Sequence, residues 1–326
     1  MSGSGGRIIA LAGGVGGAKL ADGLAQRLGE YLTVVVNTGD DFEHLGMHVS
    51  PDLDTVMYTL AGLANPSQGW GLEGESWVFM DQLSRLGGPD WFKLGDRDLA
   101  THAIRTSRLR GGATLSDVTE DLCGVLGIRS RILPMSDDSV RTMIQSDGKI
   151  LGFQEYFVRL RCEVPVTSIC FEGADRAKLN PRITKLHASE RPAAVVICPS
   201  NPYLSIDPIM AVPGAREWLA SLRVPVVAVS PIVAGSAIKG PAAKVMGELG
   251  IQVSASAIAR HYRGVVSGLV IDVSDAALSN EIESMGLPVR VAQTVMSSAA
   301  DRLALADECL EFARGLAGRA LEDSGR

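Results

Sequence analysis

Five runs of apolar, mostly β-branched residues recur along the chain without the polar alternation of a half-exposed strand. They cover residues 7–12, 32–37, 193–200, 224–230 and 265–272. Runs of this kind are typical of strands that are buried on both faces, as in a parallel sheet. Most of them precede a loop and then a segment with helical periodicity. The pattern therefore predicts strands that alternate with helices around a parallel sheet.

Helical periodicity is clearest at three places. Residues 18–28 place Leu20 and Leu24 on one face, a second apolar face runs from about 51 to 60, and residues 298–316 carry an apolar stripe before a charged tail. Combined with the apolar runs, these helices predict an α/β fold of the Rossmann-like, doubly wound type, with a mainly parallel sheet.

The middle of the chain breaks this pattern. Residues 65–127 are polar and helical in character. Residues 139–160 predict a β-hairpin that turns through Ser146-Asp147-Gly148, because Asp-Gly favours the tight turns of hairpins.

These changes in pattern set the predicted domain boundaries. We predict a Rossmann-like nucleotide-binding core formed by residues 7–64 and 161–318. Residues 65–160 form an inserted cap region of helices and a β-hairpin. The ends, residues 1–6 and 319–326, are predicted to be flexible.

Composition narrows the choice of partners. The 326 residues carry a formal net charge of -6, so the basic footprint of a protein that binds duplex nucleic acid is missing. No apolar run reaches the roughly 18 residues that a membrane helix needs, and no signal peptide is visible. The five cysteines include no C-x-x-C pair, which argues against a thiolate zinc site. We therefore expect a soluble cytoplasmic protein without a membrane or nucleic-acid partner.

A glycine-rich stretch, GGVGGAKL at residues 13–20, joins the first predicted strand to the first predicted helix. Backbone N–H groups and the helix dipole favour an anion at such a junction. The candidates for nucleotide or phosphate binding are Gly13, Gly14, Gly16, Gly17 and Lys19. The stretch is neither a P-loop, because Leu20 follows Lys19, nor the dinucleotide fingerprint G-x-G-x-x-G. A tight strand-to-helix turn without a ligand is the alternative.

Four aspartates follow the second predicted strand: Asp40, Asp41, Asp52 and Asp54. Ligands bind beyond the carboxyl ends of strands in this architecture. Carboxylates so close together repel one another unless a cation joins some of them, and oxygen ligands favour Mg²⁺ or Mn²⁺ over zinc. The alternative is that Pro51 and the acids after it only start a helix, which accounts for Asp52 better than for Asp54.

Three further segments carry polar groups that suit a ligand. The segment FKLGDRDLATH crowds charged residues together: Lys93, Asp96, Arg97, Asp98 and His102. They fit the recognition of a phosphorylated ligand, although Asp96 could instead be an N-cap among solvated charges. Ser200-Asn201-Pro202 and Ser230 each follow a buried strand, where hydroxyl, amide and N–H groups meet ligands. Ordinary proline turns are the alternative there.

The available chemistry is restricted. No nucleophile elbow, Cys/His pair or kinase signature is visible. Carboxylates, a divalent cation and phosphate-binding loops fit an in-line displacement at phosphorus without a covalent enzyme intermediate. An NAD-dependent oxidoreductase is disfavoured, since Asn37 ends the second strand where such an enzyme needs an acid.

In this order, the segments resemble the CofD/FbiA family of 2-phospho-L-lactate (or phosphoenolpyruvate) transferases. The resemblance covers residues 7–313 and rests on LAGGVGGAKL, NTGDDFEHLGMHVSPDLDTVMYTLAG, WFKLGDRDLATH, LPMSDD, PSNPYLSI with AVPGAREWL, and VAVSPIVAGSAIKGPAAK. SPDLDTVMYTLAG and KLGDRDLATH are the specific parts, whereas the glycine loop is not specific.

The resemblance implies an enzyme of coenzyme F-420 biosynthesis. Such an enzyme transfers a phospho-carboxylic acid unit from a guanosine-diphosphate-linked donor to the ribityl hydroxyl of the deazaflavin Fo. GMP leaves, and Mg²⁺ is required. The implied fold is a Rossmann-like core with a smaller added region. The alternative is a nucleotide-sugar-binding regulatory protein of the related gluconeogenesis-factor type, which shares the glycine loop and the sheet.

By the same resemblance, Asp41, Asp52 and Asp54 would serve the metal and the reacting phosphates. Catalysis would rest on Asp54, Asp52 and Lys93, with Asp54 orienting or deprotonating the ribityl hydroxyl. The glycine loop, Ser200-Asn201-Pro202 and Ser230 would hold the nucleotide. The acceptor site would comprise Asp54, Lys93, Asp96, Arg97, Thr101 and His102. The transferred acid (phospholactate, phosphoenolpyruvate or 3-phosphoglycerate) stays open, and a homodimer is the default expectation.

Overall fold

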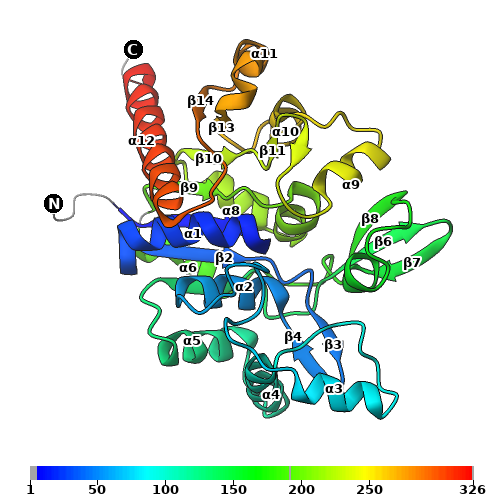
Figure 1. Ribbon diagram of the computed structural model, residues 1–326. Helices are drawn as coiled ribbons and strands as arrows, with labels where there is room; N and C mark the ends of the chain where they lie inside the picture. Colours follow the sequence, from blue (N-terminus) through cyan, green and yellow to red (C-terminus); the bar gives the residue numbers. More distant parts are fainter. Residues whose placement is uncertain (1–5, 191, 325–326) are drawn as a thin grey trace.

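A seven-stranded sheet, in which each strand runs parallel to its neighbours, forms the centre of the molecule (Figure 1). The computed structural model describes residues 6–190 and 192–324. In spatial order the strands are β14 (Val289–Ala292), β13 (Gly268–Asp272), β10 (Val226–Val229), β9 (Ala194–Ile197), β1 (Ile8–Ala12), β2 (Leu32–Val36) and β5 (Arg131–Pro134). The predicted fold class, a Rossmann-like α/β sheet, is confirmed.

The chain enters the sheet near its middle. From β1 it proceeds outward through β2 and β5, and it then continues on the other side of β1 through β9, β10, β13 and β14. The direction of winding therefore reverses between β1 and β9. At such a switch point the loops after the two strands diverge and leave a crevice in which ligands bind.

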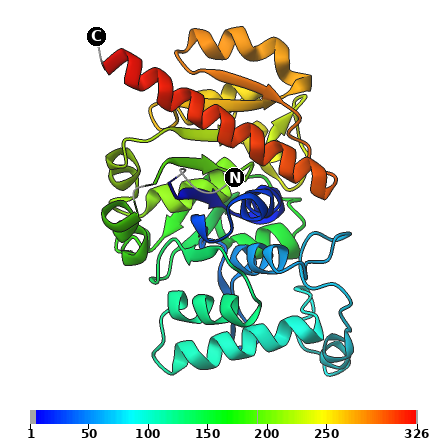
Figure 2. The same ribbon diagram turned by 90° about the vertical axis from the view of Figure 1, so that its left-hand side faces the viewer.

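Helices cover both faces of the sheet, which explains why its central strands are mainly apolar. On one face, α1 (Gly14–Leu28) packs against both α2 (Pro51–Leu60) and α12 (Ala299–Ser324). Figure 2 shows α12, in red, running along this layer. On the other face, α6 (Pro181–Glu190), α8 (Ala215–Ser221) and α10 (Ala255–His261) contribute to the second apolar core. Each residue of β1 is buried in one or other of these cores.

Two groups of elements lie outside the central sheet. One contains α3 (Val78–Arg85), α4 (Asp96–Arg110), α5 (Leu115–Val125) and the hairpin of β3 (Phe42–His44) and β4 (Met47–Val49), at the bottom of Figure 1. The other is an antiparallel sheet in the order β7 (Lys149–Gly152), β6 (Arg141–Ser146) and β8 (Ser168–Glu172). The shorter elements are η1 (Gly29–Tyr31), η2 (Glu155–Arg159), η3 (Pro202–Ile206), α7 (Asp207–Ala211), β11 (Ile232–Val233), β12 (Ser236–Ala237), α9 (Ala242–Glu248), η4 (Val273–Leu278) and α11 (Ser279–Ser284).

The structure contains the five strands and the two N-terminal helices that the sequence predicts, while the hairpin differs in one respect. Its turn at Asp147-Gly148 is correct, but the second strand ends at Gly152 and the chain then forms the π-helical turn η2. A third strand, β8, completes this small sheet.

The predicted boundaries differ from the structure at two places. β5 lies within the range 65–160, yet it pairs with β2 in the central sheet, so this range is not wholly outside the core. Residues 319–324, predicted to be a flexible end, continue α12 to Ser324. Of the other predicted end, residues 1–5 lie outside the described residues. The division into a core and a cap stays a prediction. Among the described residues, no helix is long and apolar enough to cross a membrane.

Candidate functional site

A cavity of about 560 Å³ opens at the switch point between β1 and β9. Its wall is built from the loops that follow β1, β9, β10 and β14, together with the first turns of α2 and α4. Further lining comes from residues 68–71 and 153–158. The cavity therefore lies where ligands bind in doubly wound folds, and it joins segments that are far apart in the sequence.

The glycine loop is packed more tightly than an open phosphate cradle. A Cβ on Gly13 would lie 2.4 Å from Asp52 Oδ2, and a Cβ on Gly16 would lie 2.5 Å from the carbonyl oxygen of Pro199. The Gly13 N–H donates to Ser200 Oγ at 3.0 Å, and the Gly14 N–H donates to Asp52 Oδ1 at 2.7 Å. Two N–H groups of the loop thus bind side chains of the protein, and the glycines allow three segments to meet.

Most of the predicted nucleotide-binding residues line the cavity. They are Gly13, Gly14, Gly16, Lys19, Ser200, Asn201 and Ser230. Asn201 Oδ1 accepts from the N–H groups of Tyr203 and Leu204, while its buried Nδ2 has no partner among the described residues. Gly17 and Pro202 are not part of the wall: Gly17 packs against Ser200, and Pro202 starts η3.

Lys19 forms a hydrogen bond between two segments of the chain. Its Nζ donates to the carbonyl oxygen of Met296 at 2.7 Å, which ties α1 to the loop after β14. Burial, followed by repulsion from Arg302 and Lys239, lowers the pKa of Lys19. Lys239, which the sequence analysis did not select, also lines the cavity. The cavity therefore has two lysines near the glycine loop, and one of them already binds a carbonyl group.

Asp40 and Asp52 form an acidic pair in the wall of the cavity. Asp52 Oδ2 accepts from Asn37 Nδ2 at 2.9 Å, and its other oxygen accepts from Gly14. Burial raises the pKa of Asp52 to about 6, against the opposing effect of these hydrogen bonds. Burial and the neighbouring Asp52 raise the pKa of Asp40 well above its usual value. Asp40 Oδ1 is buried without a partner in the described part of the chain.

Asp41, one of the three predicted metal ligands, is not brought into the cavity wall. Its Oδ2 accepts from Ser50 Oγ at 2.9 Å and lies 3.0 Å from His48 Nε2. The side chain thus holds the segment between β4 and α2. It is 2% exposed, and these contacts give it a structural reason to be there.

Asp54 is bound by a buried arginine that the sequence analysis missed. Arg105, on α4, donates to both carboxylate oxygens of Asp54, with a distance of 3.0 Å from Nη1 to Oδ2. Burial alone would lower the pKa of Arg105, but the charge and hydrogen bonds of Asp54 outweigh it and raise the pKa. Asp98, His102 and Arg105 are spaced four and three residues apart, so one helix face carries all three. That spacing was the available sequence signal.

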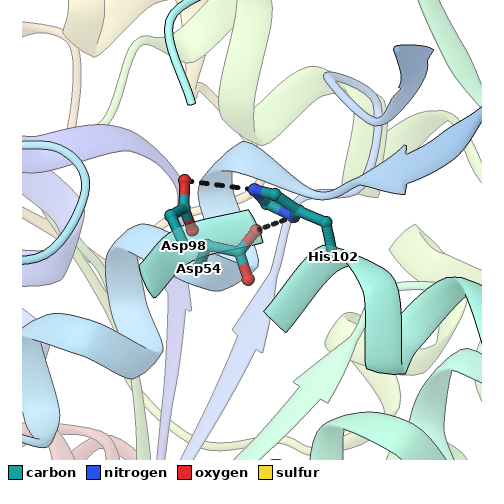
Figure 3. Close-up of side chains that lie close together, drawn as sticks. All are labelled: Asp54, Asp98 and His102. Atoms are coloured by element: carbon teal, nitrogen blue, oxygen red, sulfur yellow. Dashed lines mark ion pairs between the residues drawn. The ribbon is translucent and has the colours of Figure 1, made fainter. Parts of the chain in front are cut away.

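His102 lies between two carboxylates, as Figure 3 shows. Its Nε2 is 3.1 Å from Asp98 Oδ2, and its Nδ1 is 3.7 Å from Asp54 Oδ2. The hydroxyl of Tyr58 donates to Asp98 Oδ1 at 2.6 Å. Burial opposes the ionisation of Asp98, but His102, Tyr58 and Arg105 together hold its pKa below the usual value.

The trio of Asp54, Asp98 and His102 has the composition of a metal site, with one ligand atom from each residue within 4.8 Å of the others. Arg105 argues against a metal there, because its positive charge contacts both oxygens of Asp54. The trio is better described as part of a buried ion-pair network between α2 and α4.

The predicted acceptor residues divide into two groups. Asp54, Lys93 and His102 line the cavity, and Lys93 is exposed. Asp96, Arg97 and Thr101 are not part of the wall. Asp96 instead accepts from Ser76 Oγ and from the N–H groups of residues 78 and 79, so it caps α3. Arg97 donates to the carbonyl oxygen of Glu73.

Aromatic side chains in the wall were not among the predicted site residues. They are Tyr58, Trp70, Phe92, Phe153 and Phe157. The rings of Phe153 and Phe157 are stacked, with centroids 5.4 Å apart. Such rings give part of the cavity a flat, apolar character that suits a planar ligand.

Comparison with known proteins shows which family this chain resembles. Residues 8–304 match the sequence model of the family described as 2-phospho-L-lactate transferase CofD. A Streptomyces griseus protein named phosphoenolpyruvate transferase is 45% identical over 314 residues, which cover 94% of this chain and 98% of that protein. A protein of the same name from Streptomyces coelicolor is 42% identical, with the same coverage. A Methanosarcina mazei protein named 2-phospho-L-lactate transferase is 40% identical over 89% of this chain and 95% of its own length.

Solved structures show the same fold at lower identity. Two crystal structures from Bacillus halodurans, one described as a member of the UPF0052 family, match with TM-scores of 0.60 and 0.62. They cover 94% of this chain and 100% of their own, at 14% and 15% identity. At this identity the likeness shows the fold alone.

Proposed function

The chain belongs to the CofD family of transferases, and we propose that it moves a phosphoenolpyruvyl group from a guanosine-diphosphate-linked donor to the deazaflavin Fo. In this reaction the ribityl oxygen of Fo forms a bond to the phosphorus farther from guanosine. The bond from that phosphorus to the bridging oxygen breaks, GMP leaves with the electron pair, and the hydroxyl proton is released.

The choice of the transferred acid rests on the relatives. The two Streptomyces proteins, at 45% and 42% identity, are named for phosphoenolpyruvate, and the Methanosarcina mazei protein, at 40%, is named for 2-phospho-L-lactate. We therefore take phosphoenolpyruvate as the acid. The acids differ by small groups, and one methylene changes selectivity by only about 1–3 kcal/mol, so the assay compares all of them.

The observation that carries the proposal is that one cavity joins two environments. The glycine loop, Ser200 and Asn201 offer backbone and side-chain groups at a switch point, which suits a nucleotide diphosphate. The aromatic wall suits a planar ring such as the deazaflavin. Asp52 and Asp54, on the first turn of α2, connect these parts through their contacts with Gly14 and Arg105.

The donor set fits Mg²⁺ with Asp52, one of the three predicted ligands, and with Asp40, which was not predicted as a ligand. Asp40 Oδ1 is buried and unpartnered within the described residues, and Asp52 is its acidic neighbour. Hard oxygen ligands of this kind suit Mg²⁺. We assign the metal to Asp40 and Asp52 rather than to Asp41, which is outside the wall, or Asp54, which binds Arg105. When bound, Mg²⁺ would neutralise charge on the diphosphate.

Asp54 and Lys93 are the groups we assign to the acceptor end. Both line the cavity. Asp54 would accept the hydrogen bond of the ribityl hydroxyl and orient its oxygen toward phosphorus, because positioning contributes more to phosphoryl transfer than proton abstraction does. The exposed ammonium of Lys93 would neutralise the carboxylate of the transferred acid.

The test supplies the purified protein with Fo, Mg²⁺ and each of three guanosine-diphosphate-linked donors, built on phosphoenolpyruvate, phospholactate or 3-phosphoglycerate. Mass spectrometry follows the product and GMP. We expect the phosphoenolpyruvate donor to give the highest kcat/KM. A preference for another acid would overturn the donor assignment, and binding of GDP without turnover of any donor would overturn the transferase assignment.

We also propose that the protein works as a homodimer in the cytoplasm. Light scattering of the purified chain tests the first part, with a single-chain mass as the contrary result. Cell fractionation tests the second.

A further inference from the structure

The network beneath the acceptor end of the cavity contains more charge than stability explains. Five side chains of α2 and α4 take part: Asp54, Tyr58, Asp98, His102 and Arg105. All of them are buried, and the side chain of Arg105 is only 1% exposed. Buried ion pairs contribute little net stability compared with apolar groups of the same size. The network therefore calls for another explanation than packing.

Arg105 has the geometry of a clamp on Asp54. Nη1 donates to one carboxylate oxygen at 3.0 Å and Nη2 donates to the other. Two parallel hydrogen bonds from a planar guanidinium fix both the position and the rotation of a carboxylate, which one hydrogen bond does not. Asp54 also lines the cavity, whereas Arg105 does not. Arg105 can therefore affect the cavity only through Asp54, the side chain that it contacts.

His102 lies beside the contact between Arg105 and Asp54. Its Nδ1 lies 3.3 Å from Nη1 of Arg105 and 3.7 Å from Asp54, while its Nε2 lies 3.1 Å from Asp98. Asp98 in turn accepts from Tyr58. Both helices therefore contribute to one chain of polar contacts that ends at Asp54.

The carboxylate retains free capacity for a ligand. Two carboxylate oxygens offer about four acceptor sites, and the two hydrogen bonds from Arg105 use two of them. The remaining sites are sufficient for a hydroxyl group in the cavity. A metal ion on the same oxygens would instead lie next to the guanidinium charge.

From this arrangement we propose that Arg105 is a positioning residue, which fixes the Asp54 carboxylate for contact with the acceptor hydroxyl. The inference rests on the proposed function, since it concerns the reacting end of the same cavity. Arg105 does not line the cavity, so its loss should slow the reaction of bound substrates without weakening their binding.

The test compares R105M, R105K and the control R108M. Arg108 lies one turn further along α4 and forms a surface ion pair with Asp121. We expect R105M to lower kcat about 100- to 1,000-fold, with both KM values within about threefold of wild type. R105K keeps the positive charge but cannot form two parallel hydrogen bonds with the carboxylate. Its kcat should be at least tenfold higher than that of R105M. R108M should retain wild-type kcat.

A purely structural function would give a different result. It would lower the fraction of folded sites, counted by GDP binding, and leave kcat per folded site unchanged. That outcome, or a kcat for R105M within about threefold of wild type, would overturn the proposal. If R105M does not fold, R105K decides: a kcat equal to wild type contradicts the need for a two-point contact.

A second measurement does not depend on activity. Urea unfolding of wild type, D54N, R105M and the double variant forms a mutant cycle for the contact. Non-additive losses support the clamp, and additive losses overturn it together with the positioning role. If the wild-type protein makes no product from any donor, the proposed function is refuted instead. The mutant cycle would still test the contact between Arg105 and Asp54, because it does not depend on activity.

Discussion

Replacing Asp52 by asparagine should remove much of the pH dependence of stability between pH 4 and 7.5. Burial raises the pKa of Asp52 from 3.8 to about 6, so the folded protein binds this proton more tightly than the unfolded chain does. The resulting stabilisation is complete below about pH 4 and is lost as the pH rises through about 6. At about 1.4 kcal/mol for each pH unit, the full effect is about 3 kcal/mol.

The assay is urea unfolding at several pH values with EDTA present, for wild type, D52N and the control D121N. Asp121 forms a surface ion pair with Arg108 and is 55% exposed, so D121N is the control for the loss of a carboxylate away from the cavity. From pH 4.5 to pH 7.5, wild type should lose about 2 kcal/mol more than D52N, because part of the titration falls outside this window. Profiles of wild type and D52N that run parallel would refute the reasoning.

Magnesium provides the second arm of this test. If Mg²⁺ binds the ionised Asp52 carboxylate as proposed, protons will compete with it below about pH 6. At a fixed Mg²⁺ concentration, wild type should gain more stability at pH 7.5 than at pH 5. A saturation of ten times Kd would add about 1.4 kcal/mol. D52N should gain little at either pH, and an unchanged gain would remove Asp52 from the metal site.

Three further variants, with G124A as a control, test single contacts, each by melting temperature and substrate binding. G13A should cost about 1–3 kcal/mol and weaken GDP binding, because its Cβ would lie 2.4 Å from Asp52 Oδ2. G124A, with no atom within 4 Å, should be neutral or stabilising, and equal losses would contradict a local effect. D96A should lower the melting temperature without raising the acceptor KM, since Asp96 caps α3; a raised KM would restore it to the acceptor site. K19M should weaken GDP binding about tenfold through the lost contact with Met296, and unchanged affinity would refute this.

The sequence predicts the central strands well because several consecutive apolar residues mark each of them. A strand that is buried on both faces is apolar at most positions, so β1, β2, β9, β10 and β13 are visible as nearly continuous apolar runs. The edge strands β5 and β14 each contain an arginine, Arg131 and Arg290. The arginine leaves at most three consecutive apolar residues in either strand, which is too short a run to indicate a buried strand.

The sequence indicated many of the residues that line the cavity, but not the hydrogen bonds between them. Local sequence indicated that Asp52 lies near the glycine loop, since both follow strands at one edge of the sheet. It did not indicate that Gly14 donates to Asp52 or that Arg105 clamps Asp54, because these contacts join residues 38 and 51 positions apart. Asp41 and Asp54 were assigned to a metal by the family resemblance. The structure gives each of them other partners.

The acidic cavity and the proposed anionic donor would both need the positive charge of a cation. Without a cation, burial makes the ionised forms of Asp40 and Asp52 unfavourable, and both carboxyl groups hold protons at higher pH than usual. The diphosphate of the donor would add further negative charge to the same space. A divalent cation lowers the free energy of both, so metal and donor should each bind more tightly in the presence of the other, by the same factor. The glycine loop contributes chiefly by its lack of side chains, which lets Asp52 approach the start of α1 closely enough to accept a hydrogen bond from the N–H of Gly14.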